Sequence, residues 1–171
     1  IIFNTNQTFT SDLNVHSVRD IIINAALTSS SGIDMTFIAD YFNSGVGGVQ
    51  VTSNGSVNSG GNLTMQGYNL FVNPGSAIEL QAGSSIQAAG HIVLAKNAVG
   101  ASNITLDGNV TTGSNVAIDS AAQINQGNTG SIHGGLLTTT SIGGTALKGS
   151  NQVASFNASN TASGDIELKN T

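Results

Sequence analysis

Residues 90–119 decide the fold; they read GHIVLAKNAVGASNITLDGNVTTGSNVAID. This stretch holds three copies of one short motif, in which Gly or Ser is followed by any residue and then by an apolar-x-apolar triplet. The copies are Gly90–Leu94, Ser102–Leu106 and Ser114–Ile118. Because successive side chains of a strand alternate between its two sides, the apolar residues of each triplet point one way and the middle residue points the other way. Each copy therefore predicts a short β-strand with one dry face.

The motif recurs along the chain. Further copies are Gly61–Met65, Ser76–Leu80 and Gly164–Leu168, and looser copies are Ile21–Ile23, Ile33–Phe37 and Val49–Val51. A second, weaker apolar position lies between many of them, at Val57, Ile86, Val110 and Ile124. Two short strands are thus expected to alternate, and one pair takes roughly 12 to 15 residues.

Strands of about three to five residues are too short to be stable as isolated hairpins. The pattern favours a solenoid, in which coils stack in parallel about 4.8 Å apart and the apolar side chains form ladders along the axis. If one coil contains roughly 20 to 25 residues, the chain holds about seven coils and forms a rod about 35 Å long. The spacing leaves open whether one pair of strands or two completes a turn. The structural rival is a β-sandwich or up-and-down barrel, which would have longer strands and charged edges.

Composition supports an all-β chain. Charged residues make up only 8% of the sequence, with four basic and nine acidic side chains, whereas apolar residues make up 39%. So few charges cannot supply the polar faces of helices, while Asn, Ser and Thr suit turns and strand surfaces. The net charge of −5 and the lack of any basic cluster argue against a nucleic-acid partner.

Two aromatic-rich stretches interrupt the repeat: residues 37–42 and residues 68–72, the second followed by the turn at 73–76. They are interpreted either as extra-coil elements, near 37–45 and 68–75, or as aromatic stacks inside a wider coil, and the core role is favoured. If they are exposed, Tyr41, Phe42, Tyr68 and Phe71 become candidate stacking platforms for a glycan.

The repeats, together with residues 19–32, 134–147 and 149–168, resemble the shaft of filamentous haemagglutinin-like exoproteins. The resemblance covers nearly the whole chain, so residues 1–171 are expected to be a single continuous segment of a longer chain. It implies a right-handed parallel β-helix that is secreted to the bacterial cell surface through an outer-membrane transporter partner (two-partner secretion).

The same resemblance implies a structural or adhesive role in a virulence-related exoprotein: adhesion, haemagglutination, biofilm formation or contact-dependent toxin delivery. The partner would be a receptor or glycan on a host or bacterial surface, bound by the full-length protein. The Asn-Pro-Asn export signature of the family is not present, since Asn73-Pro74-Gly75 is only a turn. The chain therefore resembles shaft rather than secretion domain.

No residue pattern predicts a catalytic, cofactor-binding or metal site, and no enzyme activity or cofactor is expected. Asp107 and Asp119 follow equivalent motif copies, which would allow them to lie one above the other as a calcium site, but solvated corner residues are the favoured interpretation. His16, His91 and His133 lack metal-ligand spacing. Because parallel β-helices also carry polysaccharide lyases and hydrolases, a polysaccharide-active enzyme and a glycan-binding module remain the alternatives to the shaft.

Overall fold

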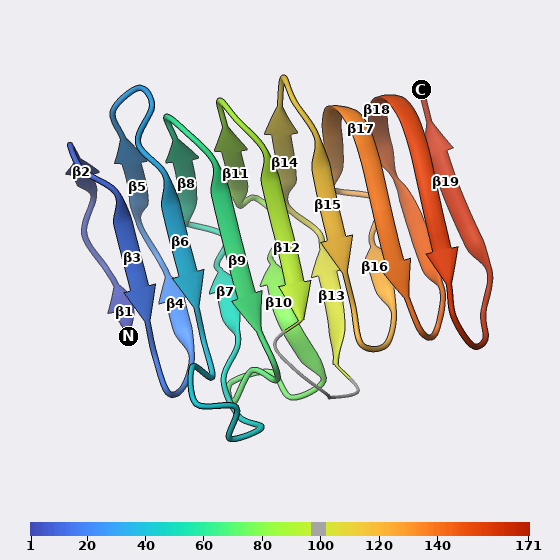
Figure 1. The fold of residues 1–171 in the computed structure, drawn as a ribbon, viewed down its shortest axis with the longest axis horizontal. Coiled ribbons are helices and arrows are strands. Elements are labelled where there is room, and N and C mark those ends of the chain that lie inside the picture. Colours follow the sequence, from blue (N-terminus) through green and yellow to red (C-terminus); the bar gives the residue numbers. More distant parts are fainter. Residues whose placement is uncertain (97–101) are drawn as a thin grey trace.

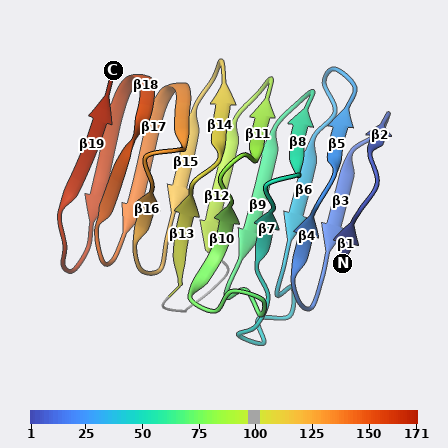
Figure 2. The ribbon, with the colours of Figure 1, turned by 180° about the vertical axis from the view of Figure 1, so that it is seen from behind.

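The computed structural model describes residues 1–96 and 102–171, and these form strands and turns without any helix. The chain winds repeatedly about one long axis, with its first and last strands at opposite ends (Figure 1). As the chain advances, the near strands run downward and the far strands run upward, which is a right-handed winding (Figure 1). The view from behind shows the same succession of coils (Figure 2). The predicted right-handed parallel β-helix is confirmed.

Each coil contributes a strand to each of three parallel stacks, which we call faces A, B and C. Face A contains β1 (Ile2–Phe3), β4 (Ile21–Ile23), β7 (Val49–Val51), β10 (Ser76–Leu80), β13 (Asn103–Leu106), β16 (Ile124–Gln126), the first part of β18 (Thr145–Asn160) and β19 (Ile166–Asn170). Face B contains β2 (Gln7–Phe9), β5 (Ala26–Ser29), β8 (Ser56–Ser59), β11 (Ser85–Ala88), β14 (Asn109–Thr112), the start of β17 (Ser131–Ser141) and the middle of β18. Face C contains β3 (Leu13–His16), β6 (Met35–Ile38), β9 (Leu63–Gly67), β12 (Ile92–Lys96), β15 (Val116–Asp119) and the ends of β17 and β18.

A coil therefore has three strands, and the simple alternation of two strands is wrong. The strong motif falls alternately on face C and face A, as in β12 and β13. The weak positions Val57, Ile86 and Val110 lie on face B, but Ile124 belongs to face A, where it pairs with Ile104. Face B gives a weak signal because its second inward position is small or polar: Ser59, Ala88 and Thr112 are all buried there.

The coil length varies along the chain. Ile104 pairs with Ile124, twenty residues later, whereas Val49 pairs with Ile78, 29 residues later. The first value lies at the lower limit of the expected range and the second exceeds it. Most of the additional residues of the long coils lie at the corners, in the connections 39–48 and 68–75, and the pairing of β10 with β13 shifts register between Ser76 and Ile78.

The core is a set of apolar ladders along the axis. On face C, one inward column consists of fully or almost fully buried residues in register: Met35, Leu63, Ile92, Val116 and Leu137. Within the described residues, the only antiparallel pairing is an isolated bridge between Gly47 and Asn69, which excludes the sandwich and barrel alternatives. Stacked parallel strands thus bury the apolar side of every motif copy.

Buried amides replace part of the apolar core in the later coils. The Gln126 and Asn151 side chains donate to each other's carbonyl oxygens at 2.9 Å, and Asn151 Oδ1 also accepts the backbone N–H of Ile132 at 2.9 Å. Both side chains are almost fully buried. Because each polar atom has a hydrogen-bond partner, the cost of burying these amides is offset, and they link successive coils.

Candidate functional site

The long coils carry their additional residues at the corner between face C and face A. Residues 39–48 connect β6 to β7, and residues 68–75 connect β9 to β10. Both segments project below the strands, next to each other along the axis (Figure 1). With residues 17–20 of the preceding coil, they form what we call the corner loops. The loops replace short turns such as residues 120–123 between β15 and β16.

The first long loop is braced by the buried carboxylate of Asp40. This carboxylate accepts hydrogen bonds from the Ser44 N–H at 2.6 Å, the Ser44 hydroxyl at 2.7 Å and the Gly45 N–H at 3.0 Å. Asp40 itself has a positive φ of 54°, a conformation that Asp and Asn tolerate better than most residues. The loop is therefore held in one shape by a side chain at its own start.

The buried carboxylate of Asp20 joins the loops of neighbouring coils. It accepts the backbone N–H groups of Gly48 and Phe71 at 3.0 Å, and that of Val72 at 3.3 Å. Three donors from two coils satisfy a charge that would otherwise be costly to bury. Asp20 therefore fixes the second loop against the first.

A short antiparallel contact completes the connection between the two long loops. The Gly47 N–H donates to the Asn69 carbonyl at 2.7 Å, and the Asn69 N–H donates back at 3.1 Å. Gly47 has a φ of 140°, and a Cβ there would lie 2.8 Å from the backbone nitrogen of Asp40. Only glycine fits such a position without a shift of the backbone.

The braced loops expose aromatic side chains. The Tyr41 ring stacks on the His16 ring, with centroids 4.3 Å apart and planes inclined by 15°, and Phe42 meets Tyr41 edge-on at 5.4 Å. Phe71 lies on the second long loop. The guanidinium of Arg19, from residues 17–20, lies 4.1 Å from the centroid of the Phe71 ring. Tyr41, Phe42 and Phe71 are 46%, 74% and 62% exposed.

The core role that the sequence favoured for the aromatic stretches is therefore wrong for these three side chains. It is right for Phe37, which is fully buried and meets Phe3 edge-on at 6.2 Å, and for Leu70, which is also buried. Tyr68 is half-buried, and a Cβ at Gly45 would contact its ring at 3.6 Å. The four predicted platforms thus divide into three exposed rings and one ring that packs beneath the first loop.

Sequence reasoning missed the groups that hold these rings. Asp20, Asp40 and Gly47 lie outside the repeat and form no recognisable motif, so no local signal identified them. The sequence shows Arg19 as one of four scattered basic residues and His16 as a histidine without metal-ligand spacing. Their stacking on Phe71 and Tyr41 brings together residues from different coils.

The acidic residues considered at the sequence level do not form a site. Asp107 follows β13 on face A and accepts the Gly127 N–H at 2.8 Å, whereas Asp119 lies in β15 on face C and pairs with Lys96 at 2.7 Å. The two carboxylates do not lie one above the other, because equivalent motif copies occupy different faces. In the described ranges, no group of three or more His, Cys, Asp or Glu residues has a metal-binding arrangement.

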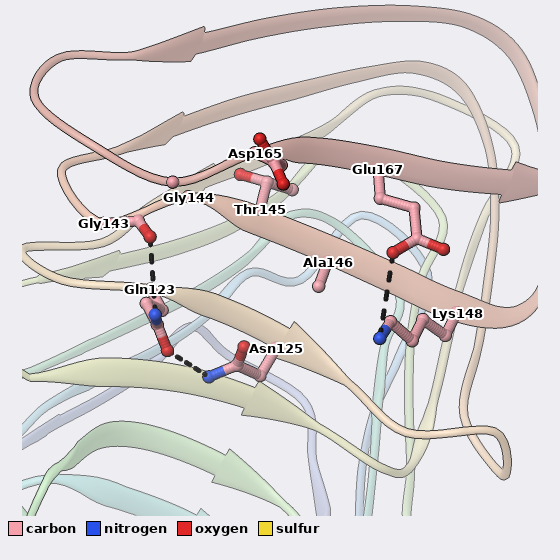
Figure 3. Close-up of a pocket in the computed structure, with 10 residues that line it drawn as sticks. Gln123, Asn125, Gly143, Gly144, Thr145, Ala146, Lys148, Asp165 and Glu167 are labelled. Atoms are coloured by element: carbon pink, nitrogen blue, oxygen red, sulfur yellow. Dashed lines mark hydrogen bonds and ion pairs between the residues drawn. The ribbon is translucent and has the colours of Figure 1, made fainter.

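A shallow polar depression lies on face A near the last coil, with a volume of about 240 Å³. Figure 3 shows Gln123 and Asn125 on one side, the small Ala146 between, and Asp165 and Glu167 on the other side. Lys148 approaches Glu167 at 3.8 Å, and the Gln123 amide donates to the Gly143 carbonyl at 3.4 Å. These polar groups are exposed and mostly satisfied by one another.

Comparisons with known proteins add no relative: no protein family, no curated protein and no solved structure matches this chain. Within the described residues, no helix is long and apolar enough to cross a membrane. The class that the structure defines is the parallel β-helix with elaborated corner loops.

Proposed function

We propose that this chain is a structural and adhesive shaft segment of a secreted bacterial surface exoprotein, of the filamentous haemagglutinin-like type. The observation that carries the proposal is the continuity of the apolar columns, which run in register through successive coils along one axis. Such a rod extends by about 4.8 Å for each added coil and can hold a binding element away from the cell. Its work is mechanical and needs no catalytic group.

The proposal includes export. Because coils stabilise their neighbours, folding can propagate from whichever end leaves the membrane first and assist passage through an outer-membrane transporter partner. Deleting the gene for that transporter should remove the full-length protein from the cell surface, as measured by antibody staining of intact bacteria. Unchanged staining would contradict the export route.

The shaft role is tested by replacement in the full-length protein. Residues 1–171 are exchanged for the same number of coils from an unrelated parallel β-helix, and bacterial adhesion to cultured cells is measured. A shaft predicts unchanged adhesion at equal surface display. Loss of adhesion at equal display would contradict a purely mechanical role and would favour a binding function within the segment.

A second candidate function, a glycan-binding β-helix module, is favoured by the exposed rings of Tyr41, Phe42 and Phe71. Flat aromatic faces are suitable platforms for the apolar faces of sugar rings. On a glycan array, Tyr41→Ala should lose at least about tenfold in binding, if stacking contributes roughly 1.4 kcal/mol. Ile142→Ala is a matched control, because Ile142 is 45% exposed at the same corner of a later coil.

A further inference from the structure

The corner loops concentrate exposed apolar surface in the N-terminal half of the rod. Among the described residues, the exposed large apolar side chains outside the corner loops are Ile1, Ile2, Ile142 and Ile166, which lie apart from one another along the chain. The corner itself exposes Val18, Tyr41, Phe42, Val46, Phe71 and Val72. Contiguous exposed apolar surface on a soluble protein is usually a place of interaction.

The loops are preorganised for such an interaction. Two buried carboxylates, Asp20 and Asp40, are committed to backbone N–H groups that hold the loops in place. A ligand that binds here does not have to order the segment, so less of the interaction energy is lost on binding. The loops that carry the aromatic rings are therefore already ordered before a ligand binds.

The corner also carries one exposed cation, Arg19, in the same loops as the buried carboxylates of Asp20 and Asp40, which are bonded to backbone N–H groups. Within the described residues, Lys96 pairs with Asp119 and Lys148 with Glu167, but Arg19 forms no ion pair and lies over the Phe71 ring instead. Arg19 is exposed, and its stacked guanidinium keeps donors available for a partner. Since no carboxylate of the described residues forms an ion pair with it, this guanidinium can bind an anionic group of a ligand.

A planar guanidinium fits a carboxylate best, because two parallel N–H groups can bond its two oxygens. The neighbouring rings offer apolar faces of the size of one sugar ring each, and Asn43 is an exposed amide in the first loop, whereas the Asn73 amide donates to Glu79 at 2.9 Å. A nucleic acid would require several cations, and a protein partner of standard size would require about 800 Å² of surface. One guanidinium beside a few exposed aromatic rings matches a glycan better than either.

We propose that the corner loops bind a glycan whose sugar carries a carboxylate, with Arg19 holding the carboxylate and Phe71 and Tyr41 stacking on the sugar rings. This inference rests on the glycan-binding candidate and specifies its ligand class. Arg19 serves two purposes at once, since its guanidinium edge bonds the carboxylate while its face stays stacked on Phe71.

The test measures binding of the 171-residue chain by isothermal titration calorimetry. The probes are 3′-sialyllactose, trigalacturonate and, as neutral matches, the methyl esters of both, which remove the carboxylate charge and keep the sugar rings. At least one acidic probe should bind at least about tenfold more tightly than its neutral match, a difference of roughly 1.4 kcal/mol. Binding should weaken when NaCl is raised from about 50 to about 500 mM, because screening reduces the charge attraction.

Variants assign the binding to the corner. Arg19→Gln and Phe71→Ala should each reduce acidic-probe affinity at least about tenfold. Lys169→Gln removes the same charge on exposed β19 and should change the affinity less than twofold. Urea unfolding of each variant establishes that the fold is retained. Arg19→Lys tests whether the planar guanidinium is needed, and we expect its loss of affinity to lie between those of the unchanged chain and Arg19→Gln.

The outcomes separate the two ideas. Neutral probes that bind as well as acidic ones, with loss in Phe71→Ala but not in Arg19→Gln, would overturn the carboxylate inference and leave glycan binding in place. No binding of any probe at millimolar concentration would overturn both and leave the shaft proposal untouched. Equal loss in Lys169→Gln and Arg19→Gln would show a general charge effect and overturn the assignment to the corner.

Discussion

At the scale of single residues, the polar side chains that matter most are those that satisfy backbone groups of another coil. Asp34 accepts the N–H of Asn62 at 2.7 Å and Asn62 accepts that of His91 at 2.8 Å, one coil further in each case. Asp20 follows the same rule inside the corner, where it is nearly buried. Short polar side chains therefore stabilise the fold through hydrogen bonds to backbone groups of the neighbouring coil rather than through ion pairs.

Asp20→Asn tests the most demanding of these positions. An amide keeps one acceptor oxygen but places an NH₂ group against backbone donors, so we expect a loss of about 1 to 3 kcal/mol in the free energy of unfolding. Asp165→Asn, at an exposed carboxylate in the last coil, should change it by less than about 0.5 kcal/mol. Urea denaturation measures both, and equal midpoints for the two variants would contradict the role of Asp20.

Glycine has an equally specific role where coils approach closely. A Cβ on Gly60 would overlap the carbonyl group of Ser30 in the preceding coil, whereas a Cβ on Gly113 would meet no atom within 4 Å. Gly60→Ala should therefore destabilise the chain by about 1 to 3 kcal/mol through overpacking, and Gly113→Ala should be nearly neutral. Thermal unfolding measures the melting temperatures of the two variants, and equal values would contradict this role of Gly60.

At the scale of the element, a strand is stable only because both neighbours in its stack are present. The β12 strand pairs with β9 and β15 and directs Ile92 and Leu94 inward, while Val93 points outward. The alternation in the sequence predicted this face correctly. The period of the repeat did not reveal the third strand of each coil, since face B strands contain only one large apolar residue.

Leu94→Ala should cost about 2 to 5 kcal/mol, because the side chain is fully buried and the rigid ladder cannot collapse around the cavity. Val93→Ala on the same strand removes a partly exposed side chain and should cost less than about 1 kcal/mol. Chemical denaturation of the two variants is the measurement. A smaller effect at Leu94 than at Val93 would mean that the inward and outward assignment is reversed.

At the scale of the whole molecule, stability is a sum over coils and their interfaces. In a sample of residues 1–171 alone, the first and last coils pair on one side only, and Ile2 and Ile166 are 61% and 44% exposed there, whereas residues of β10 to β13 have neighbours on both sides. Amide hydrogen exchange should therefore be fastest in β1 to β3 and β19 and slowest in β10 to β13. Uniform protection along the chain would indicate a single cooperative unit instead.

The sequence by itself determined the fold class and the inward residues, because the alternation of apolar side chains is a local property of each strand. It also named the aromatic residues of the corner. Only the tertiary structure decided that a coil has three strands and that Tyr41, Phe42 and Phe71 face solvent. The physical reason is that exposure there depends on loops held by Asp20 and Asp40, and on Arg19 meeting Phe71 from two coils away, which are contacts between residues far apart in the chain.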